Sequence, residues 1–92
     1  MSPFTESEIA ARLASVPAWT VENGELVRIF AFKDFRAALA FVNSVGELAE
    51  QAGHHPDIDI RYNRVRLSLV THDANGLTAK DFDLAAKASA IA

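Results

Sequence analysis

Hydrophobic and polar residues alternate most regularly in the second half of the chain. Across residues 57–62, apolar or aromatic side chains occupy every second position and charged ones lie between them. Residues 64–69 repeat this alternation, with valine and leucine on one face and arginine and serine on the other. The pattern predicts two strands that each bury one face. The tight connection at Asn63-Arg64 pairs them as an antiparallel hairpin with one covered and one solvent-facing side.

A second hairpin is indicated nearer the start of the chain. Residues 19–21 and 26–32 are rich in β-branched and aromatic side chains, and Asn23-Gly24 lies between them. This dipeptide favours a type I′ turn, which needs positive φ at both central residues. Glu22 and Glu25 would then face each other, which is mildly unfavourable. The register of this hairpin is therefore left open.

The longest helix is expected between Asp34, a suitable N-cap, and Gly53, a suitable terminator. Gly46 interrupts this helix at a cost of about 1 kcal/mol relative to alanine, which close backbone packing would explain. Apolar side chains recur at spacings of three and four, as in a helix that packs on a sheet: Phe35, Ala38, Leu39, Phe41, Val42, Val45, Leu48, Ala49 and Ala52.

Two further helices carry the same start signal. Thr5 and Glu8 form a capping-box pattern that begins a short helix, which Pro17 is expected to end. Thr78 and Asp81 repeat the pattern before an alanine-rich segment that runs to the end of the chain. The element order is α-β-β-α-β-β-α. This order predicts an α+β fold with a four-stranded antiparallel sheet and helices packed on one face.

Composition narrows the class of protein. The 92 residues, 50% of them hydrophobic, suit a single domain over residues 1–92. A net charge of −3 argues against nucleic-acid binding, which needs a basic face. No apolar run is long enough to span a membrane, and the first residues lack a secretory signal pattern. We therefore expect a cytoplasmic protein with no nucleic-acid or membrane partner.

The three histidines, His54, His55 and His72, all fall in one stretch of the sequence. His54 and His55 precede the third expected strand, and His72 follows the fourth. Because the start of one antiparallel strand lies beside the end of its partner, the three imidazoles should meet at one edge of the sheet. Imidazole titrates near pH 6.5, so such a cluster suits proton transfer at neutral pH.

Several chemistries could use this cluster. A metal site is disfavoured because adjacent histidines usually diverge, although Asp57 or Asp73 could add a carboxylate. A hydrolytic triad is disfavoured because no G-x-S-x-G elbow is present. In the plainest alternative, His54 completes a helix end and the other two histidines are surface residues. The convergence of all three favours metal-free acid/base catalysis.

These residues resemble the pterin-4a-carbinolamine dehydratases, also called dimerization cofactor of hepatocyte nuclear factor. The resemblance covers nearly the whole chain. Its one noted departure is Asn75, where many members carry glycine, and this affects only the turn geometry. The matching positions are Trp19, Phe32, Asp34-Phe35, Glu50, His54-His55-Pro56, Tyr62-Asn63, Thr71-His72-Asp73, Gly76-Leu77-Thr78 and Asp81.

The resemblance implies dehydration of a 4a-hydroxytetrahydropterin, such as 4a-hydroxytetrahydrobiopterin, to the quinonoid dihydropterin and water. This step would recycle the pterin of an aromatic amino acid hydroxylase, a possible functional partner. No separate cofactor is implied, since the pterin is the substrate. His54 and His72 are expected to form the acid/base pair, with the assignment of acid and base open. His55 is expected to position or stabilise the substrate.

The supporting residues have two interpretations each. Asp81 caps a helix or orients an imidazole. Glu50, and in the same way Asp57, binds the guanidine-like edge of the pterin or simply faces solvent. Trp19 is a core residue or, as we favour, a wall of the pterin pocket. Tyr62 is expected in the core.

The resemblance also implies a second class of function. Mammalian relatives act as dimerisation partners of a homeodomain transcription factor, so a binding module that acts as a transcriptional coactivator is an alternative. A role in molybdopterin metabolism is a third. A homodimer or homotetramer is expected in each case.

Overall fold

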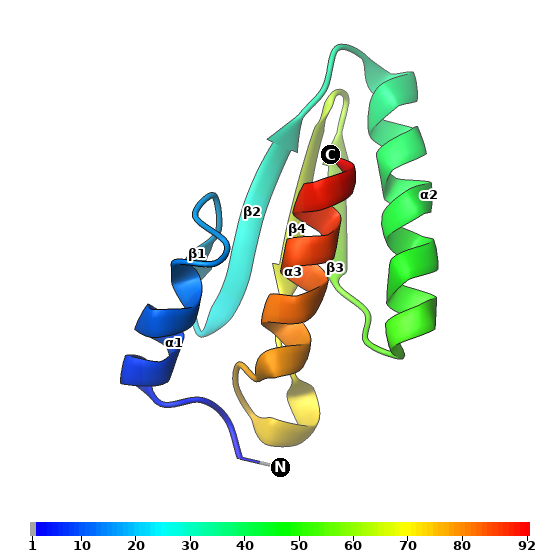
Figure 1. Cartoon of the computed structure of the whole chain (residues 1–92). Coiled ribbons are helices and arrows are strands. Elements are labelled where there is room, and N and C mark those ends of the chain that lie inside the picture. Colours follow the sequence, from blue (N-terminus) through cyan, green and yellow to red (C-terminus); the bar gives the residue numbers. More distant parts are fainter. Residues whose placement is uncertain (1) are drawn as a thin grey trace.

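The computed structural model describes residues 2–92, and Met1 lies outside the described residues. The elements follow the expected order (Figure 1). They are α1 (Glu6–Leu13), β1 (Thr20–Glu22), β2 (Glu25–Ala31), α2 (Phe35–Ala52), β3 (Asp57–Arg61), β4 (Arg64–Leu69), the short 3-10 helix η1 (His72–Ala74) and α3 (Ala79–Ile91).

The four strands form one antiparallel sheet in the order β1-β2-β4-β3. Helices α2 and α3 lie side by side against one face of this sheet, and α1 lies beside the β1–β2 hairpin (Figure 1). The α+β architecture expected from the sequence is confirmed. Among residues 2–92, no helix is both long and apolar enough to cross a membrane.

The first hairpin forms as the sequence predicts. Asn23 has φ of 51° and Gly24 has φ of 77°, so both turn residues adopt the positive φ of a type I′ turn. Glu22 pairs directly with Glu25. The register that the two glutamates left open is thus the one that pairs them. The turn geometry outweighs the repulsion between the exposed carboxylate of Glu22 and the half-buried one of Glu25, which accepts a hydrogen bond from Ser68.

The second hairpin turns one residue earlier than expected. Arg61 pairs with Arg64, so the connection is Tyr62-Asn63 rather than Asn63-Arg64. Tyr62 has φ of 52° and is 67% exposed, which contradicts its expected place in the core. The side chain leaves the strand because the turn needs a left-handed residue there. Asn63 anchors the turn by donating from Nδ2 to the carbonyl of Phe32, at 2.8 Å.

Helix α2 begins and ends where predicted. The side chain of Asp34 accepts a hydrogen bond from the backbone N–H of Ala37, and Gly53 ends the helix in the left-handed conformation. Only one stripe of the broad apolar face is buried, and Phe35 and Leu39 remain 44% and 40% exposed. A side chain at Gly46 would meet nothing within 4 Å, so the expected close packing at this glycine is wrong.

The other two helices differ in how well their ends were predicted. Both capping boxes form, Thr5 with Glu8 in α1 and Thr78 with Asp81 in α3. Helix α1, however, ends at Leu13 and not at Pro17. The residues between them form turns that bring Val16 into the core.

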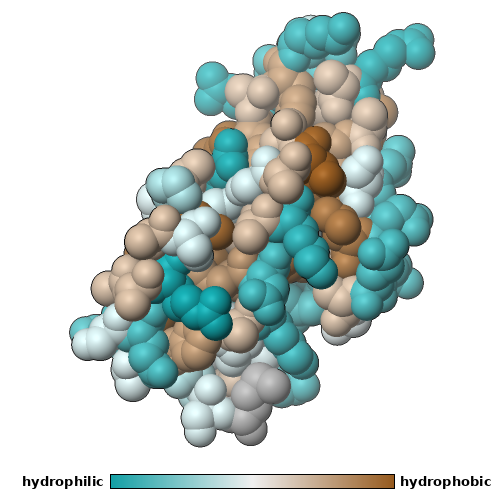
Figure 2. Space-filling view, in the orientation of Figure 1, coloured by the Kyte–Doolittle hydropathy of each residue, from teal (hydrophilic) through white to brown (hydrophobic). Residues whose placement is uncertain are grey.

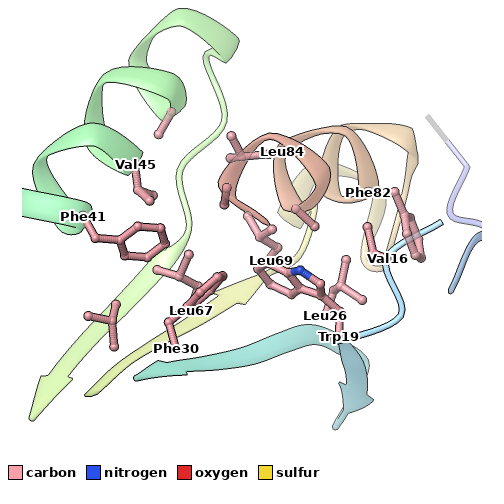
Figure 3. Close-up of a cluster of buried hydrophobic side chains, with 14 of the residues drawn as sticks. Val16, Trp19, Leu26, Phe30, Phe41, Val45, Leu67, Leu69, Phe82 and Leu84 are labelled. Atoms are coloured by element: carbon pink, nitrogen blue, oxygen red, sulfur yellow. The ribbon is translucent and has the colours of Figure 1, made fainter. Parts of the chain in front are cut away.

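The core lies between the sheet and helices α2 and α3 (Figure 3). Trp19 packs edge-on against Phe30, with ring centroids 5.9 Å apart, and Phe30 also contacts Phe41. Trp19 Nε1 donates to Ser89 Oγ at 2.8 Å, which satisfies its one polar group within α3. This packing fixes α3 over the sheet, and the start of α3 in turn carries part of the histidine pocket described next.

Candidate active site

The three histidines line one pocket of about 250 Å³ at the edge of the sheet. His54 and His55 come from the segment that joins α2 to β3, and His72 opens η1 after β4. Strands β3 and β4 pair antiparallel, which brings the two segments together. The predicted convergence of the imidazoles is confirmed. The lining residues are Gly53, His54, His55, Val70, Thr71, His72, Asp73 and Lys80.

A second hollow of similar volume lies on the helix-free face of the sheet. It is lined by Ile29, Asp59, Arg61, Arg64 and Arg66. None of these residues is a histidine, the side chain best suited to proton transfer near neutral pH. The histidine pocket is therefore the candidate active site.

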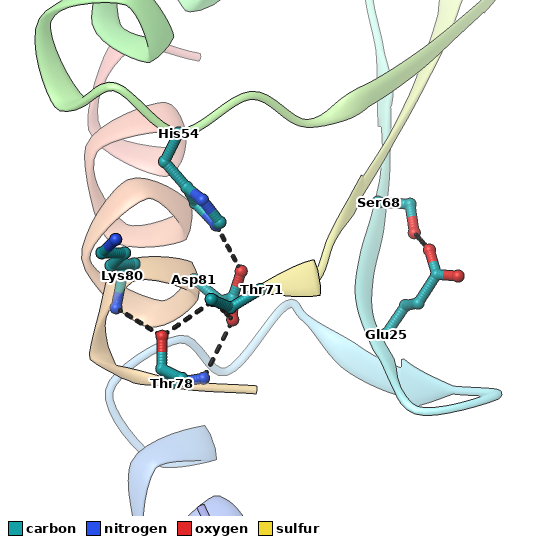
Figure 4. A network of polar contacts seen from close by, with 7 residues as sticks. All are labelled: Glu25, His54, Ser68, Thr71, Thr78, Lys80 and Asp81. Carbon is teal, nitrogen blue, oxygen red and sulfur yellow. Dashed lines mark hydrogen bonds and ion pairs between the residues drawn. The ribbon is translucent and has the colours of Figure 1, made fainter. Parts of the chain in front are cut away.

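His54 is held by a buried carboxylate. Its Nε2 lies 2.6 Å from Oδ1 of Asp81, in the first turn of α3 (Figure 4). The side chain of Asp81 is 0% exposed and that of His54 is 11% exposed. A short charge-assisted contact shielded from water is stronger than an exposed one. This contact therefore fixes the ring of His54 against the start of α3.

The second carboxylate oxygen of Asp81 accepts two hydrogen bonds. Oδ2 accepts from Thr71 Oγ1 at 2.8 Å and from the backbone N–H of Thr78 at 2.9 Å. The hydroxyls of Thr71 and Thr78 lie 2.8 Å apart, so Thr78 donates to Thr71 while Thr71 donates to Asp81 (Figure 4). Both donors aimed at Oδ2 leave Oδ1 to His54 alone.

This network sets the tautomer of His54. An ionised carboxylate only accepts hydrogen bonds, so Nε2 of His54 carries the hydrogen that points to Asp81. In the neutral ring the lone pair is then on Nδ1. No buried side-chain nitrogen or oxygen among residues 2–92 lacks a hydrogen-bond partner, and Nδ1 of His54 has none, so this atom reaches solvent. Nδ1 is thus the atom through which His54 can exchange a proton.

His55 has a different environment. Its Nε2 contacts Oε2 of Glu50 at 2.5 Å, and the two side chains are 61% and 74% exposed. Glu50 lies in the last turn of α2, where the helix dipole disfavours a carboxylate, and the contact with His55 offsets this. Because both groups face water, the pair contributes little to stability.

His72 is the third imidazole, and the loop around it is tightly held. The backbone of Thr71 exchanges hydrogen bonds with that of Gly76, which closes the loop across η1. A Cβ at Gly76 would lie 2.7 Å from Cβ of Pro3, so only glycine fits beside the N-terminal segment there. Within the described chain, the exposed ring of His72 makes no side-chain hydrogen bond and is available to a ligand.

The remaining predicted residues lie elsewhere. Asp57 begins β3, is exposed, and does not line the pocket. Trp19, expected as a pocket wall, is buried in the core at 3% exposure because its ring fills the space between β2 and α3. Sequence reasoning did not single out Lys80 or Gly53 as pocket residues. Their positions in the sequence were the available signal: Lys80 lies two residues after the helix cap Thr78, and Gly53 directly precedes His54.

Within residues 2–92, no group of three or more histidine, cysteine, aspartate or glutamate side chains is arranged to bind a metal ion. The arrangement instead offers two kinds of imidazole: one fixed by a buried carboxylate and one free at the pocket rim. Such a pair can take a proton from one atom of a ligand and give one to another.

Comparison with known proteins identifies the family. Residues 2–91 match the family model described as "Pterin 4 alpha carbinolamine dehydratase". The chain is 62% identical over 91 residues to a protein of Acidobacterium capsulatum, covering 99% of each, and 64% identical over 86 residues to one of Chloroflexus aurantiacus, covering 94% of this chain and 92% of the other. Both relatives carry the name "Putative pterin-4-alpha-carbinolamine dehydratase". The chain belongs to the pterin-4-alpha-carbinolamine dehydratase family.

Solved structures agree with this assignment. The crystal structure of a transcriptional coactivator/pterin dehydratase from Brucella melitensis superposes with a TM-score of 0.95 at 38% identity, covering 99% of both chains. A pterin dehydratase-like RuBisCO assembly factor of the alpha-carboxysome gives a TM-score of 0.66 at 23% identity, over 79% of this chain and 84% of that one. The second likeness shows the shared fold alone.

Proposed function

We propose that this protein dehydrates a 4a-hydroxytetrahydropterin to the quinonoid dihydropterin. The observation that carries the proposal is the pocket itself, in which imidazoles from two chain-distant segments meet and one of them is held by a buried carboxylate. Membership of the family supports the same reaction. The pterin is the substrate, and we propose no separate cofactor.

The reaction needs two proton transfers. The C4a–O bond breaks as a proton reaches the leaving hydroxyl, and the proton on N5 departs as the C4a=N5 double bond forms. We assign the base to His54, because Asp81 orients its Nδ1 lone pair and stabilises the ring once it is protonated. The acid is His72, whose ring has no partner among the described residues and so can turn toward the leaving oxygen.

His55 and Glu50 have a supporting role in this proposal. His55 lines the pocket, and Glu50 holds its ring through the 2.5 Å contact at Nε2. His55 would position the pterin, and Glu50 would act through His55 and not on the ring edge of the pterin. A contact between Asp57 and the substrate stays a prediction from the sequence.

Replacing each histidine by glutamine tests these roles. We expect His54→Gln and His72→Gln to lower kcat for dehydration of a freshly generated carbinolamine by about 10²-fold or more, and His55→Gln mainly to raise KM. Glutamine keeps the size and polarity of the ring but cannot exchange protons. The proposal fails if none of the three variants loses at least about tenfold in turnover, a lower limit set by the usual contribution of a positioned acid or base.

In the cell, this activity would regenerate the pterin used by an aromatic amino acid hydroxylase in the cytoplasm. A coupled assay tests the link. Adding the protein to a hydroxylase that turns over a tetrahydropterin should raise the rate at which quinonoid dihydropterin appears. The His54→Gln variant should raise that rate far less than the wild type does.

Self-association is part of the proposal. Strand β3 is an edge strand of the sheet, and exposed apolar side chains occur on it and on α2: Ile58 at 41%, Phe35 at 44% and Leu39 at 40%. Figure 2 shows hydrophobic patches on the half of the visible face that holds α2 and the end of α3. Unpaired edges and exposed apolar patches favour a homodimer or homotetramer. Sedimentation should show the variant Leu39→Asn shifted toward monomer, and Ile29→Asn, on the helix-free face, unshifted.

The same surface supports the second candidate function. The Brucella melitensis protein is described as a transcriptional coactivator as well as a pterin dehydratase. A dimerisation module would need the exposed apolar residues but not the imidazoles. Intact self-association without any acceleration of dehydration would favour this alternative.

A further inference from the structure

Lys80 is the one lysine among the residues that line the histidine pocket. It is exposed and lies in the first turn of α3, next to the Thr78–Asp81 cap (Figure 4). Its backbone N–H donates to Thr78 Oγ1 at 3.3 Å, so the start of its side chain is held in place. The long side chain therefore leaves the protein from a fixed point at the pocket rim.

A contribution to the stability of α3 does not explain the positive charge of Lys80. A cation in the first turn of a helix opposes the helix dipole, which favours acidic residues there. Among residues 2–92, the ammonium group of Lys80 makes no ion pair, and Asp73, the acidic side chain that also lines the pocket, makes none either. The nearest carboxylate along α3, Asp81, is buried and spends both oxygens on His54, Thr71 and Thr78. Lys80 thus places a positive charge that no ion pair occupies at the rim of the pocket, which Asp73 lines as well.

We propose that Lys80 selects pterins that carry an anionic substituent, a phosphate or a carboxylate. The bicyclic ring would lie among the imidazoles, and the substituent would extend to the exposed rim, where Lys80 can pair with it. The ammonium group has three donors on a flexible stem, which suits the oxygens of either anion. This inference rests on the proposed function for the place of the ring, and it names the substrate class within it.

Equilibrium binding of stable dihydropterins tests the inference without relying on turnover. Three ligands are compared by calorimetry: a neutral 6-hydroxymethyl-dihydropterin, its phosphate monoester, and a dihydropterin with a 6-carboxylate. We expect the wild-type protein to bind at least one anionic ligand about twofold to fivefold more tightly than the neutral one, because fivefold is the upper value for an exposed ion pair. The preference should weaken as salt is added.

Matched variants assign the preference to one side chain. Lys80→Gln should bring the ratio of the neutral to the anionic Kd close to one, and Lys80→Arg should keep it, because arginine retains the charge. Lys87→Gln removes the same charge from an exposed position further along α3 that does not line the pocket, and should keep the wild-type ratio. A preference for the phosphate alone or the carboxylate alone identifies the anion. Equal Kd values for all three ligands in the wild type, or a ratio that Lys80→Gln leaves unchanged, would overturn the inference.

The dehydration assay separates this inference from the proposed function. A preference that depends on Lys80, in a protein that does not accelerate dehydration, would support the anion selectivity and overturn the proposed reaction. Acceleration of dehydration with no preference among the three ligands would do the reverse.

Discussion

His54 Nε2 lies 2.6 Å from Oδ1 of Asp81, and that carboxylate is completely buried at the start of α3. The same carboxylate caps the helix, because its other oxygen accepts the backbone N–H of Thr78. One side chain therefore joins the end of α2, the end of β4 through Thr71, and the start of α3 (Figure 4). The contacts that hold these three segments together therefore also orient the candidate base.

The substitution Asp81→Asn separates charge from shape. The amide can still accept the N–H of Thr78, but it cannot stabilise a protonated ring at His54. We expect kcat for dehydration to fall by about 10²-fold while KM changes little, because the lost interaction develops during proton transfer. A KM that rises as much as kcat falls would show that Asp81 shapes the pocket and does not assist the base.

Removing the side chain of Asp81 altogether should weaken the fold. Asp81→Ala leaves Thr71, Thr78 and His54 without their shared acceptor in a buried place, which we expect to lower the free energy of unfolding by about 3 kcal/mol. Glu8→Ala removes the same capping-box position in α1, where the group is exposed, and should cost about 0.5–1 kcal/mol. Urea unfolding of the two variants measures the difference. Equal losses would contradict a special role for the buried box.

Two glycines should respond in opposite ways to alanine. Gly24 adopts φ of 77°, so Gly24→Ala should destabilise the protein by about 1 kcal/mol although no atom blocks the new methyl group. Gly46 lies in α2 with open space around it, so Gly46→Ala should stabilise the protein by about 0.5–1 kcal/mol. Thermal unfolding of both variants checks the signs. A destabilising Gly46→Ala would point to a contact of α2 that the single chain lacks.

Trp19 offers a test of its place in the core. Trp19→Phe loses the hydrogen bond to Ser89 and part of the ring, which we expect to lower the free energy of unfolding by about 1–2 kcal/mol. Because Trp19 does not line the pocket, turnover at a temperature well below unfolding should stay within about twofold of the wild type, far less than loss of an acid or base would cause. A large loss of turnover in a well-folded variant would instead support the expectation from the sequence that Trp19 is a wall of the pocket.

The sequence predicted those parts of the fold that local chemistry dictates. Alternation, the Asn23-Gly24 turn and two capping boxes are signals carried by neighbouring residues, and all of them appear in the structure. The second turn was misplaced by one residue because Tyr62 continues the alternation, while the backbone needs a left-handed residue at that position. No neighbouring residue in the sequence indicates that Tyr62 adopts the turn conformation and does not continue the strand.

The sequence predicted the part of the candidate site that depends on the pairing of the strands. The convergence of His54 and His72 follows from antiparallel geometry alone. The contact between His54 and Asp81 depends on how α3 packs over the sheet, so the sequence left two roles for that aspartate where the geometry combines them. The position of Trp19 likewise depends on packing, because an indole suits a core and a ligand wall equally well.

The decay of a freshly generated 4a-carbinolamine, with and without protein, tests the account most directly. The wild-type protein should accelerate this decay well above the buffer rate. The folded double variant His54→Gln/His72→Gln should return it to within about tenfold of the uncatalysed value, since both proton-transfer groups are gone. A wild-type protein no faster than buffer, or a double variant as fast as the wild type, would contradict the assignment of the paired imidazoles as the acid and base.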